Sequence, residues 1–291
     1  MEIFLGITAA LCWGVADFSA RFASRRLGAY STLAWMQLFG FIALLPYMAR
    51  SGSLSRALPL GWHAWGFAVL AGLLNVVSSL ALYRSFEIGV MSIVGPVSSA
   101  YPALTVTLAF LSGERIAPLR VAGLAVTFAG VLLAAISFPK SSPSPGAPDS
   151  RLDWARGAGW AVVAAVGFGV MFWWLGFHVV PSLGGALSVW VIRLTSLSAL
   201  MLVAVPARQR VRIPRGNIWW LLAAVGVTDT AAFVANNAGM AFGHVSVVSV
   251  LSSLYGAITV LLSWIFLRER LGKSQWLGIF LIFAGIVFVS L

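Results

Sequence analysis

The sequence contains ten almost wholly apolar stretches, each long enough to form a helix that crosses a membrane, and this pattern limits the chain to membrane-spanning folds. A transmembrane helix needs about 20 apolar residues to cross about 30 Å of hydrocarbon. A water-soluble domain could not bury so much apolar surface, because 60% of the 291 residues are hydrophobic and only 9% are charged. We therefore predict an all-α polytopic membrane protein with ten transmembrane helices. The stretches lie near residues 2–21, 30–49, 63–84, 91–111, 119–138, 157–179, 186–206, 217–239, 245–267 and 275–291.

A segment rich in proline and serine separates the first five stretches from the last five. It runs from Pro139 to Pro148 without apolar periodicity, which is typical of an exposed linker. We therefore expect a first five-helix repeat over residues 1–138, a linker over 139–153 and a second five-helix repeat over 154–291.

The two halves resemble each other at a nearly constant offset. The segment Ser98–Thr105 matches Ser252–Thr259, 154 residues later, and Glu114–Arg115 matches Glu269–Arg270, 155 residues later. Because each half has an odd number of predicted helices, the second half must enter the membrane from the opposite face, so the repeats are inverted. Inverted repeats are the architecture of alternating-access transporters, which bind substrate near mid-membrane where the repeats meet. The sequence therefore predicts a central cavity between the two halves.

The formal net charge of +11 would suggest a nucleic-acid partner in a water-soluble protein. In a membrane protein, lysine and arginine instead mark the cytoplasmic loops. Of the 19 basic residues, four lie on the side of the N-terminus, fourteen on the opposite side, and Arg193 lies within a predicted helix. This count places both termini outside the cytoplasm, and we expect no nucleic-acid partner. The single cysteine, Cys12, excludes a disulfide framework and a cysteine-based metal site.

Three ionisable residues lie well within the predicted helices: Asp17, Arg193 and Asp229. A charge at the centre of a membrane helix costs about 2.5–3.5 kcal/mol, so such residues form pairs or serve function. Arg193 and Asp229 fall at similar depths. They either form an ion pair that braces two helices, or they act in transport, with Arg193 binding a substrate carboxylate and Asp229 carrying a coupling proton. Asp17 lies about one turn from a predicted helix end, and we interpret it as reaching the membrane interface.

Polar and aromatic residues on the apolar helices extend the predicted substrate site. Polar side chains find no partners in lipid, so they face other helices or a water-filled cavity. Tryptophan rings either fill packing space or line a pocket with cation–π capacity. Interhelical hydrogen bonding and packing are thus the alternatives to substrate binding. The candidate substrate-binding residues are Trp13, Asn75, Ser79, Tyr83, Ser98, Ser99, Tyr101, Trp174, Trp190, Arg193, Asp229, Asn236, Asn237, Ser252 and Tyr255.

The fourth predicted helix contains backbone-weakening residues at three positions: Gly95, Pro96 and Pro102. Proline removes a backbone donor and bends a helix. We therefore predict a gate or hinge here, with packing curvature as the alternative. The matching ninth helix has no proline.

Three groups of residues carry a family likeness. They are Trp13-Gly14 with Phe18, the Pro102-x-x-Thr105 helix before Gly113-Glu114-Arg115, and the glycine pairs Gly123/Gly130 and Gly278/Gly285 in the closing helix of each half. Together they resemble the drug/metabolite transporter superfamily, specifically its ten-helix EamA-type members, and most of all bacterial exporters of amino acids, including aromatic ones. The resemblance implies a basket of helices 1–4 and 6–9 around the cavity, with helices 5 and 10 as outer supports. It also implies cytoplasmic termini, in conflict with the count of basic residues.

The sequence lacks the motifs of competing function classes. It has no H-E-x-x-H zinc motif, no Gly-x-Ser-x-Gly nucleophile elbow, no phosphate-binding loop for ATP and no pore-loop filter. We therefore predict a gradient-driven exporter rather than an enzyme or a channel. The expected cargo is amino acids, neutral and aromatic ones included, with multidrug or other metabolite export as the alternative. We expect no cofactor, no metal, a multi-pass location in the bacterial cytoplasmic membrane, lipid as the surroundings, and a monomer or homodimer.

Overall fold

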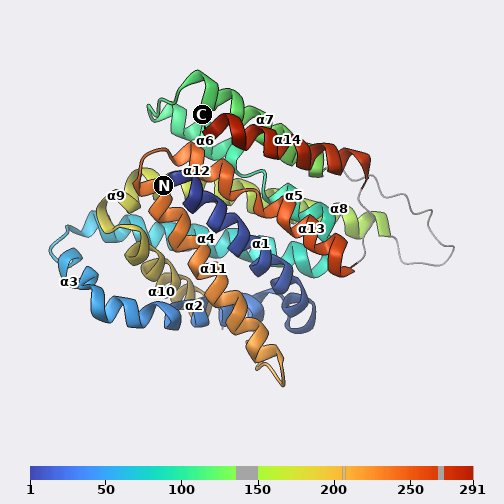
Figure 1. Ribbon diagram of the computed structural model, residues 1–291. Coiled ribbons are helices and arrows are strands. Elements are labelled where there is room, and N and C mark those ends of the chain that lie inside the picture. Colours follow the sequence, from blue (N-terminus) through green and yellow to red (C-terminus); the bar gives the residue numbers. More distant parts are fainter. Residues whose placement is uncertain (136–149, 205, 207, 268–271, 291) are drawn as a thin grey trace.

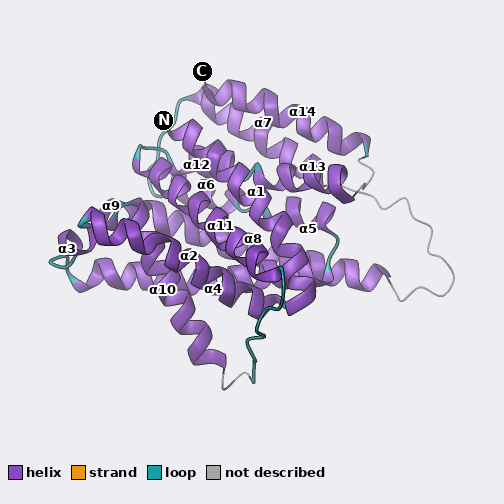
Figure 2. Ribbon diagram, turned by 60° about the horizontal axis from the view of Figure 1, so that its bottom comes forward, coloured by secondary structure: helices purple, strands orange, loops and turns teal. Residues whose placement is uncertain are grey.

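A computed structural model describes residues 1–135, 150–204, 206, 208–267 and 272–290 (Figure 1). Every regular element within these ranges is a helix (Figure 2). The predicted linker lies outside the described residues up to residue 149, and so does the Glu269–Arg270 pair.

The helices follow the predicted stretches, and three of the ten stretches, the fourth, sixth and ninth, are each divided between two elements. The first half contains α1 (Glu2–Leu27), α2 (Ala29–Ser51), α3 (Ser53–Ala57), α4 (Trp62–Ile88), α5 (Met91–Ser98), α6 (Pro102–Leu111) and α7 (Pro118–Ala135). The second half contains α8 (Ser150–Trp174), the π-helical turn η1 (Leu175–Val179), α9 (Val180–Leu183), α10 (Gly185–Ala204), α11 (Ile218–Ala241), α12 (Val245–Ser252), α13 (Tyr255–Leu267) and α14 (Lys273–Ser290). The short helices α3 and α9 were not predicted.

Eight helical spans of the described residues are long and apolar enough to cross a membrane. The fifth and tenth predicted helices have shorter apolar stretches there, Pro118–Gly130 and Trp276–Gly285. Large apolar side chains are exposed on many of these helices, including Phe280 and Phe283 on α14, as expected where lipid rather than water is the solvent. The chain is therefore an all-helical polytopic membrane protein, as predicted.

The two halves interlock instead of forming separate bundles. The helix α1 packs against α11, α12 and α13 of the second half, and α4 packs against α8 and α10. These contacts obey the internal repeat, because the α1–α11 pair has its counterpart in α8–α4, and the α2–α11 pair has its counterpart in α10–α4. A cavity enclosed by these helices is thus lined by both repeats.

The closing helices of the two halves, α7 and α14, lie side by side at one edge of the molecule, near the C-terminus (Figures 1 and 2). Small residues make this pairing close. A Cβ atom at Gly285 would lie 2.5 Å from the backbone nitrogen of Thr127 and 2.8 Å from the carbonyl oxygen of Gly123, so only glycine fits. The glycine at position 285 therefore permits close packing of α14 against α7 beside Gly123.

Candidate substrate site

The fourth and ninth predicted helices both break near their middle. The first break separates α5 from α6, between Ser98 and Pro102, and the second separates α12 from α13, between Ser252 and Tyr255. The break beside Pro96 and Pro102 fits the predicted bend, since proline cannot donate a backbone hydrogen bond. The break between Ser252 and Tyr255 contains no proline and was not predicted.

Matched serine pairs occur at both breaks and give them a common cause. Before the first break, Ser98 Oγ donates to Gly95 O and Ser99 Oγ to Pro96 O, both at 2.9 Å. Before the second break, the repeat-related Ser252 and Ser253 make the same bonds to carbonyls three residues earlier, at 3.2 and 2.7 Å. Serine hydroxyls that bond to nearby carbonyls compete with helix hydrogen bonding. Adjacent serines therefore mark the break in each half.

Two repeat-related tyrosines connect the broken helices across the halves. Tyr101 Oη lies 2.6 Å from Ser252 Oγ and donates to Ser249 O at 3.0 Å. In the reciprocal contact, Tyr255 Oη donates to Ser98 Oγ at 3.2 Å. The two rings stack with 6.5 Å between centroids and 13° between planes. We call these contacts the tyrosine crossing.

The helices approach closely beside the tyrosine crossing. A Cβ atom at Gly256 would lie 2.7 Å from Ser99 Cβ and 2.1 Å from Ser99 Oγ. The absence of a side chain at Gly256 therefore permits α13 to contact α5 at this depth. The two helices belong to different halves, so any relative movement of the halves must change this contact.

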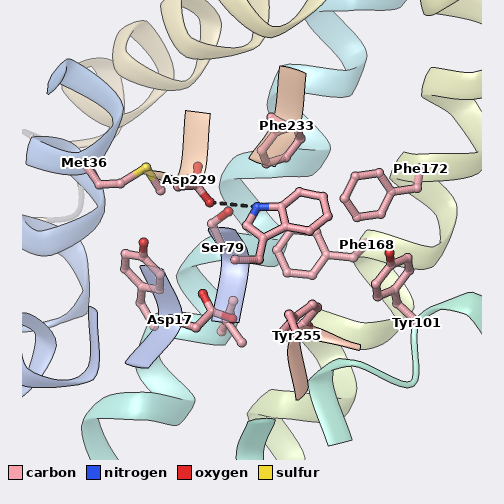
Figure 3. A pocket seen from close by; sticks show the side chains of 12 residues that line it. Asp17, Met36, Ser79, Tyr101, Phe168, Phe172, Asp229, Phe233 and Tyr255 are labelled. Atoms are coloured by element: carbon pink, nitrogen blue, oxygen red, sulfur yellow. Dashed lines mark hydrogen bonds between the residues drawn. The ribbon is translucent and has the colours of Figure 1, made fainter. Parts of the chain in front are cut away.

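A cavity lies beside the tyrosine crossing, between the two repeats (Figure 3). Its free volume of about 30 Å³ holds about two water molecules. The cavity is lined by Trp13, Asp17, Met36, Ser79, Leu82, Tyr83, Tyr101, Phe168, Phe172, Asp229, Phe233 and Tyr255.

The two intramembrane residues predicted to lie at similar depth, Arg193 and Asp229, form an ion pair. Arg193 is fully buried; its Nη2 donates to Asp229 Oδ2 and its Nη1 donates to Gln37 Oε1 at 2.7 Å. Trp13 Nε1 donates to the other Asp229 oxygen at 3.1 Å, the bond drawn in Figure 3. The guanidinium carbon of Arg193 also lies 5.1 Å from the Phe233 ring centroid. The pair thus connects α1, α2, α10 and α11, as its bracing interpretation requires.

The interpretation of Asp17 as an interfacial residue is wrong. Asp17 is only 5% exposed and lines the cavity. The error arose because the predicted helix ended at residue 21, whereas α1 continues to Leu27, about 9 Å farther at 1.5 Å per residue. Among the described residues, no hydrogen bond or ion pair engages the Asp17 carboxylate.

The structure brings six of the predicted substrate-binding residues to the cavity wall: Trp13, Ser79, Tyr83, Tyr101, Asp229 and Tyr255. The remaining nine lie elsewhere. Ser98, Ser99 and Ser252 belong to the helix breaks, and Arg193 lies behind Asp229. Hydrogen bonds join Asn75 to Ser196, Asn236 to the adjacent Asn237, Asn237 to Ser188 and Trp174 to the carbonyl of Phe67, while Trp190 stacks on Phe41.

Sequence reasoning missed six lining residues: Asp17, Met36, Leu82, Phe168, Phe172 and Phe233. Helical spacing carried a signal for some of them, because residues four apart share one face of a helix. Asp17 follows Trp13 by four residues, and Phe233 follows Asp229 by four. Four-residue spacing from Trp13 and Asp229 therefore indicates both residues as lining residues.

Comparisons with known proteins agree with this architecture. The sequence profile of the EamA-like transporter family matches residues 1–136 and 154–291, one match for each half. The uncharacterized protein MJ1333.1 of Methanocaldococcus jannaschii is 27% identical over 136 residues, which cover 46% of this chain and 96% of that protein. A protein of known crystal structure aligns with 99% of this chain and 96% of its own, at a TM-score of 0.73 and 21% identity. This last likeness shows the fold.

Proposed function

Because the chain belongs to the EamA-like transporter family, we propose that it exports small metabolites from the cytoplasm by alternating access to its central cavity. The observation that carries the proposal is that residues from both halves of the chain line the cavity. Trp13, Ser79 and Tyr101 come from the first half, and Phe172, Asp229 and Tyr255 from the second. A cavity shared by inverted repeats can open to either face when the halves move relative to each other. We place the protein in the cytoplasmic membrane of a bacterium, with repeats over residues 1–138 and 154–291.

The tyrosine crossing is the proposed gate. Opening the cavity toward one face separates α5 from α13, which breaks the bonds of Tyr101 and Tyr255 to the opposite half. A hydrogen bond of this kind contributes about 1 kcal/mol net, so a substrate can readily compensate for its loss. Gly95, Pro96 and Pro102 allow α5 and α6 to bend independently during this movement.

We propose amino acids, neutral and aromatic ones included, as the cargo, with multidrug or other metabolite export as the alternative. The rings of Phe168, Phe172 and Phe233 provide apolar walls for a flat or bulky side chain. The drive is an ion or solute gradient. Asp229 is engaged by Arg193 and Trp13, which favours the bracing role of Asp229 over a role in carrying a coupling proton.

Transport by purified protein in liposomes tests this function. Exchange of radiolabelled amino acids is expected to be saturable, faster than in protein-free liposomes and insensitive to ATP. An imposed pH gradient separates proton-coupled from uncoupled flux, and an Asp229→Asn variant with full pH-dependent flux would exclude Asp229 as the proton carrier. If a broad panel of amino acids and other metabolites moved no faster than in protein-free liposomes, the transport proposal would be wrong.

A further inference from the structure

The cavity contains one carboxylate that is paired and one that is not. Asp229 accepts hydrogen bonds from Trp13 and Arg193. Asp17, on the same cavity wall, is 95% buried and has no hydrogen bond or ion pair among the described residues (Figure 3). A buried carboxylate is unfavourable without a partner. An ammonium group of a ligand at Asp17 would give this carboxylate a partner, as Arg193 does for Asp229.

The surroundings of the two carboxylates are aromatic. The ring centroid of Trp13 lies 5.4 Å from that of Phe172, 5.2 Å from that of Phe233 and 6.2 Å from that of Tyr255. Tyr101 lies 4.9 Å from Phe172. The faces of aromatic rings attract ammonium groups, and clusters of such rings bind organic cations in many proteins. The rings and the carboxylate together favour a ligand with an ammonium group and a flat apolar body.

Among the described residues, the cavity wall offers no positively charged side chain to a ligand carboxylate. None of the described residues that line the cavity is a lysine, arginine or histidine. Arg193, behind the wall, is fully buried, and its two terminal nitrogens are committed to Asp229 and Gln37. A carboxylate in the cavity would therefore lie near two acidic groups without a cationic partner of its own.

Part of the backbone at the helix breaks is already hydrogen-bonded within the chain. Half-helix N-termini bind anions in other transporters through free N–H groups. Here the first turn of α6 is bonded internally, with Leu104 N donating to Tyr101 O at 3.1 Å. The first turn of α13 is bonded similarly, with Ile258 N donating to Leu254 O at 3.0 Å.

We propose that the cavity selects its substrates by their amino group, which binds at Asp17 among the aromatic rings, and that it disfavours a carboxylate. The substrate class is arylalkylamines, in which a short chain joins a primary ammonium group to an aromatic ring. An aromatic amino acid carries the same ring and ammonium group, but its carboxylate makes it the weaker ligand. The inference rests on the proposed transport function and specifies which end of the substrate is recognised.

Four compounds that share the indole ring test this assignment: tryptamine, tryptophan, the neutral alcohol tryptophol and the anion indole-3-propionate. Their dissociation constants are measured by calorimetry on the purified full-length protein in detergent. Tryptamine is expected to bind about tenfold more tightly than tryptophan or tryptophol, because it alone adds a cation without an anion. Indole-3-propionate is expected to bind most weakly.

Variants of Asp17 test whether the ammonium group of the ligand binds at this residue. Asp17→Asn is expected to weaken tryptamine binding about tenfold, to the level of tryptophol, while tryptophol binding stays unchanged. Asp17→Glu keeps the charge and is expected to retain the preference for the amine. The matched control is Glu87→Gln, the same carboxylate-to-amide change outside the cavity wall, where Glu87 accepts a hydrogen bond from Ala29 N; it is expected to change none of the four constants.

Measuring both binding and exchange across liposomes separates a failure of this inference from a failure of the proposed transport function. Equal or tighter binding of tryptophan, equal weakening of all ligands by Asp17→Asn, or binding of none of the four compounds would overturn the inference. Exchange of amino acids across liposomes without a preference for amines would overturn it while supporting the transport function. Tight, Asp17-dependent binding of tryptamine without exchange of any compound would support the amine site and contradict the transport function.

Discussion

Replacing Arg193 by methionine is expected to lower the free energy of unfolding by about 3–5 kcal/mol, the usual cost of removing one partner of a buried ion pair. The substitution leaves Asp229 in the protein interior with Trp13 as its remaining donor. It also leaves Gln37 Oε1 without the donor that holds it at 2.7 Å. Equilibrium unfolding in mixed micelles, followed by tryptophan fluorescence, measures the loss.

A second substitution distinguishes two contributions to the loss of stability in Arg193→Met: the unpaired charge of Asp229 and the lost packing of Arg193. Asparagine at position 229 removes the negative charge but keeps an oxygen that can accept the hydrogen bond from Trp13. The double variant Arg193→Met/Asp229→Asn is therefore expected to recover most of the stability, since an isolated buried charge costs more than a neutral polar group. If the double variant were as unstable as Arg193→Met alone, the ion pair would not be the source of the loss.

Locking α5 to α13 is expected to reduce transport to the level of protein-free liposomes. A Cβ atom at Gly95 lies 3.6 Å from the Cβ atom of Thr259, and disulfides typically join Cβ atoms 3.5–4.5 Å apart. The variant Gly95→Cys/Thr259→Cys is made with Cys12→Ala, which removes the single native cysteine. Oxidation then joins the two halves covalently at the proposed gate, and the substrate cannot enter from both faces.

The disulfide between positions 95 and 259 can be reduced again, and this reversal serves as the control. Reduction of the disulfide is expected to restore exchange, and each single-cysteine variant is expected to be unaffected by the oxidant. The fraction cross-linked is measured on gels after blocking free thiols. Full exchange by completely cross-linked protein would mean that the α5–α13 contact does not open during transport.

Much of the helix framework could be predicted from the sequence because lipid imposes a fixed length on apolar segments. The stretch predicted at 245–267 coincides with α12 and α13 together, and that at 91–111 with α5 and α6 together. The inverted repeat was visible because Ser98–Thr105 and Ser252–Thr259 keep the same residue types at matched positions.

The inward face of each helix could not be predicted with the same success. A helix that is apolar all round carries no polar face to mark its orientation. The prediction therefore includes Trp174 and Trp190, which do not line the cavity, and omits Phe168 and Phe172, which do. Proline residues predict only the first break, whereas paired serine hydroxyls occur at both, so proline alone gives no signal for the break after Ser252. Asp17 was misplaced because the end of α1 was set too early.

Accessibility of a cavity residue from both sides of the membrane tests alternating access most directly. Ser79 lines the cavity and is 5% exposed, so Ser79→Cys in the Cys12→Ala background gives a small reactive probe. Ser85→Cys is the control, because Ser85 is fully buried on the same helix and does not line the cavity. We predict that a membrane-impermeant maleimide labels Ser79→Cys in both right-side-out and inverted vesicles and spares Ser85→Cys. Labelling of Ser79→Cys from only one side would contradict alternating access.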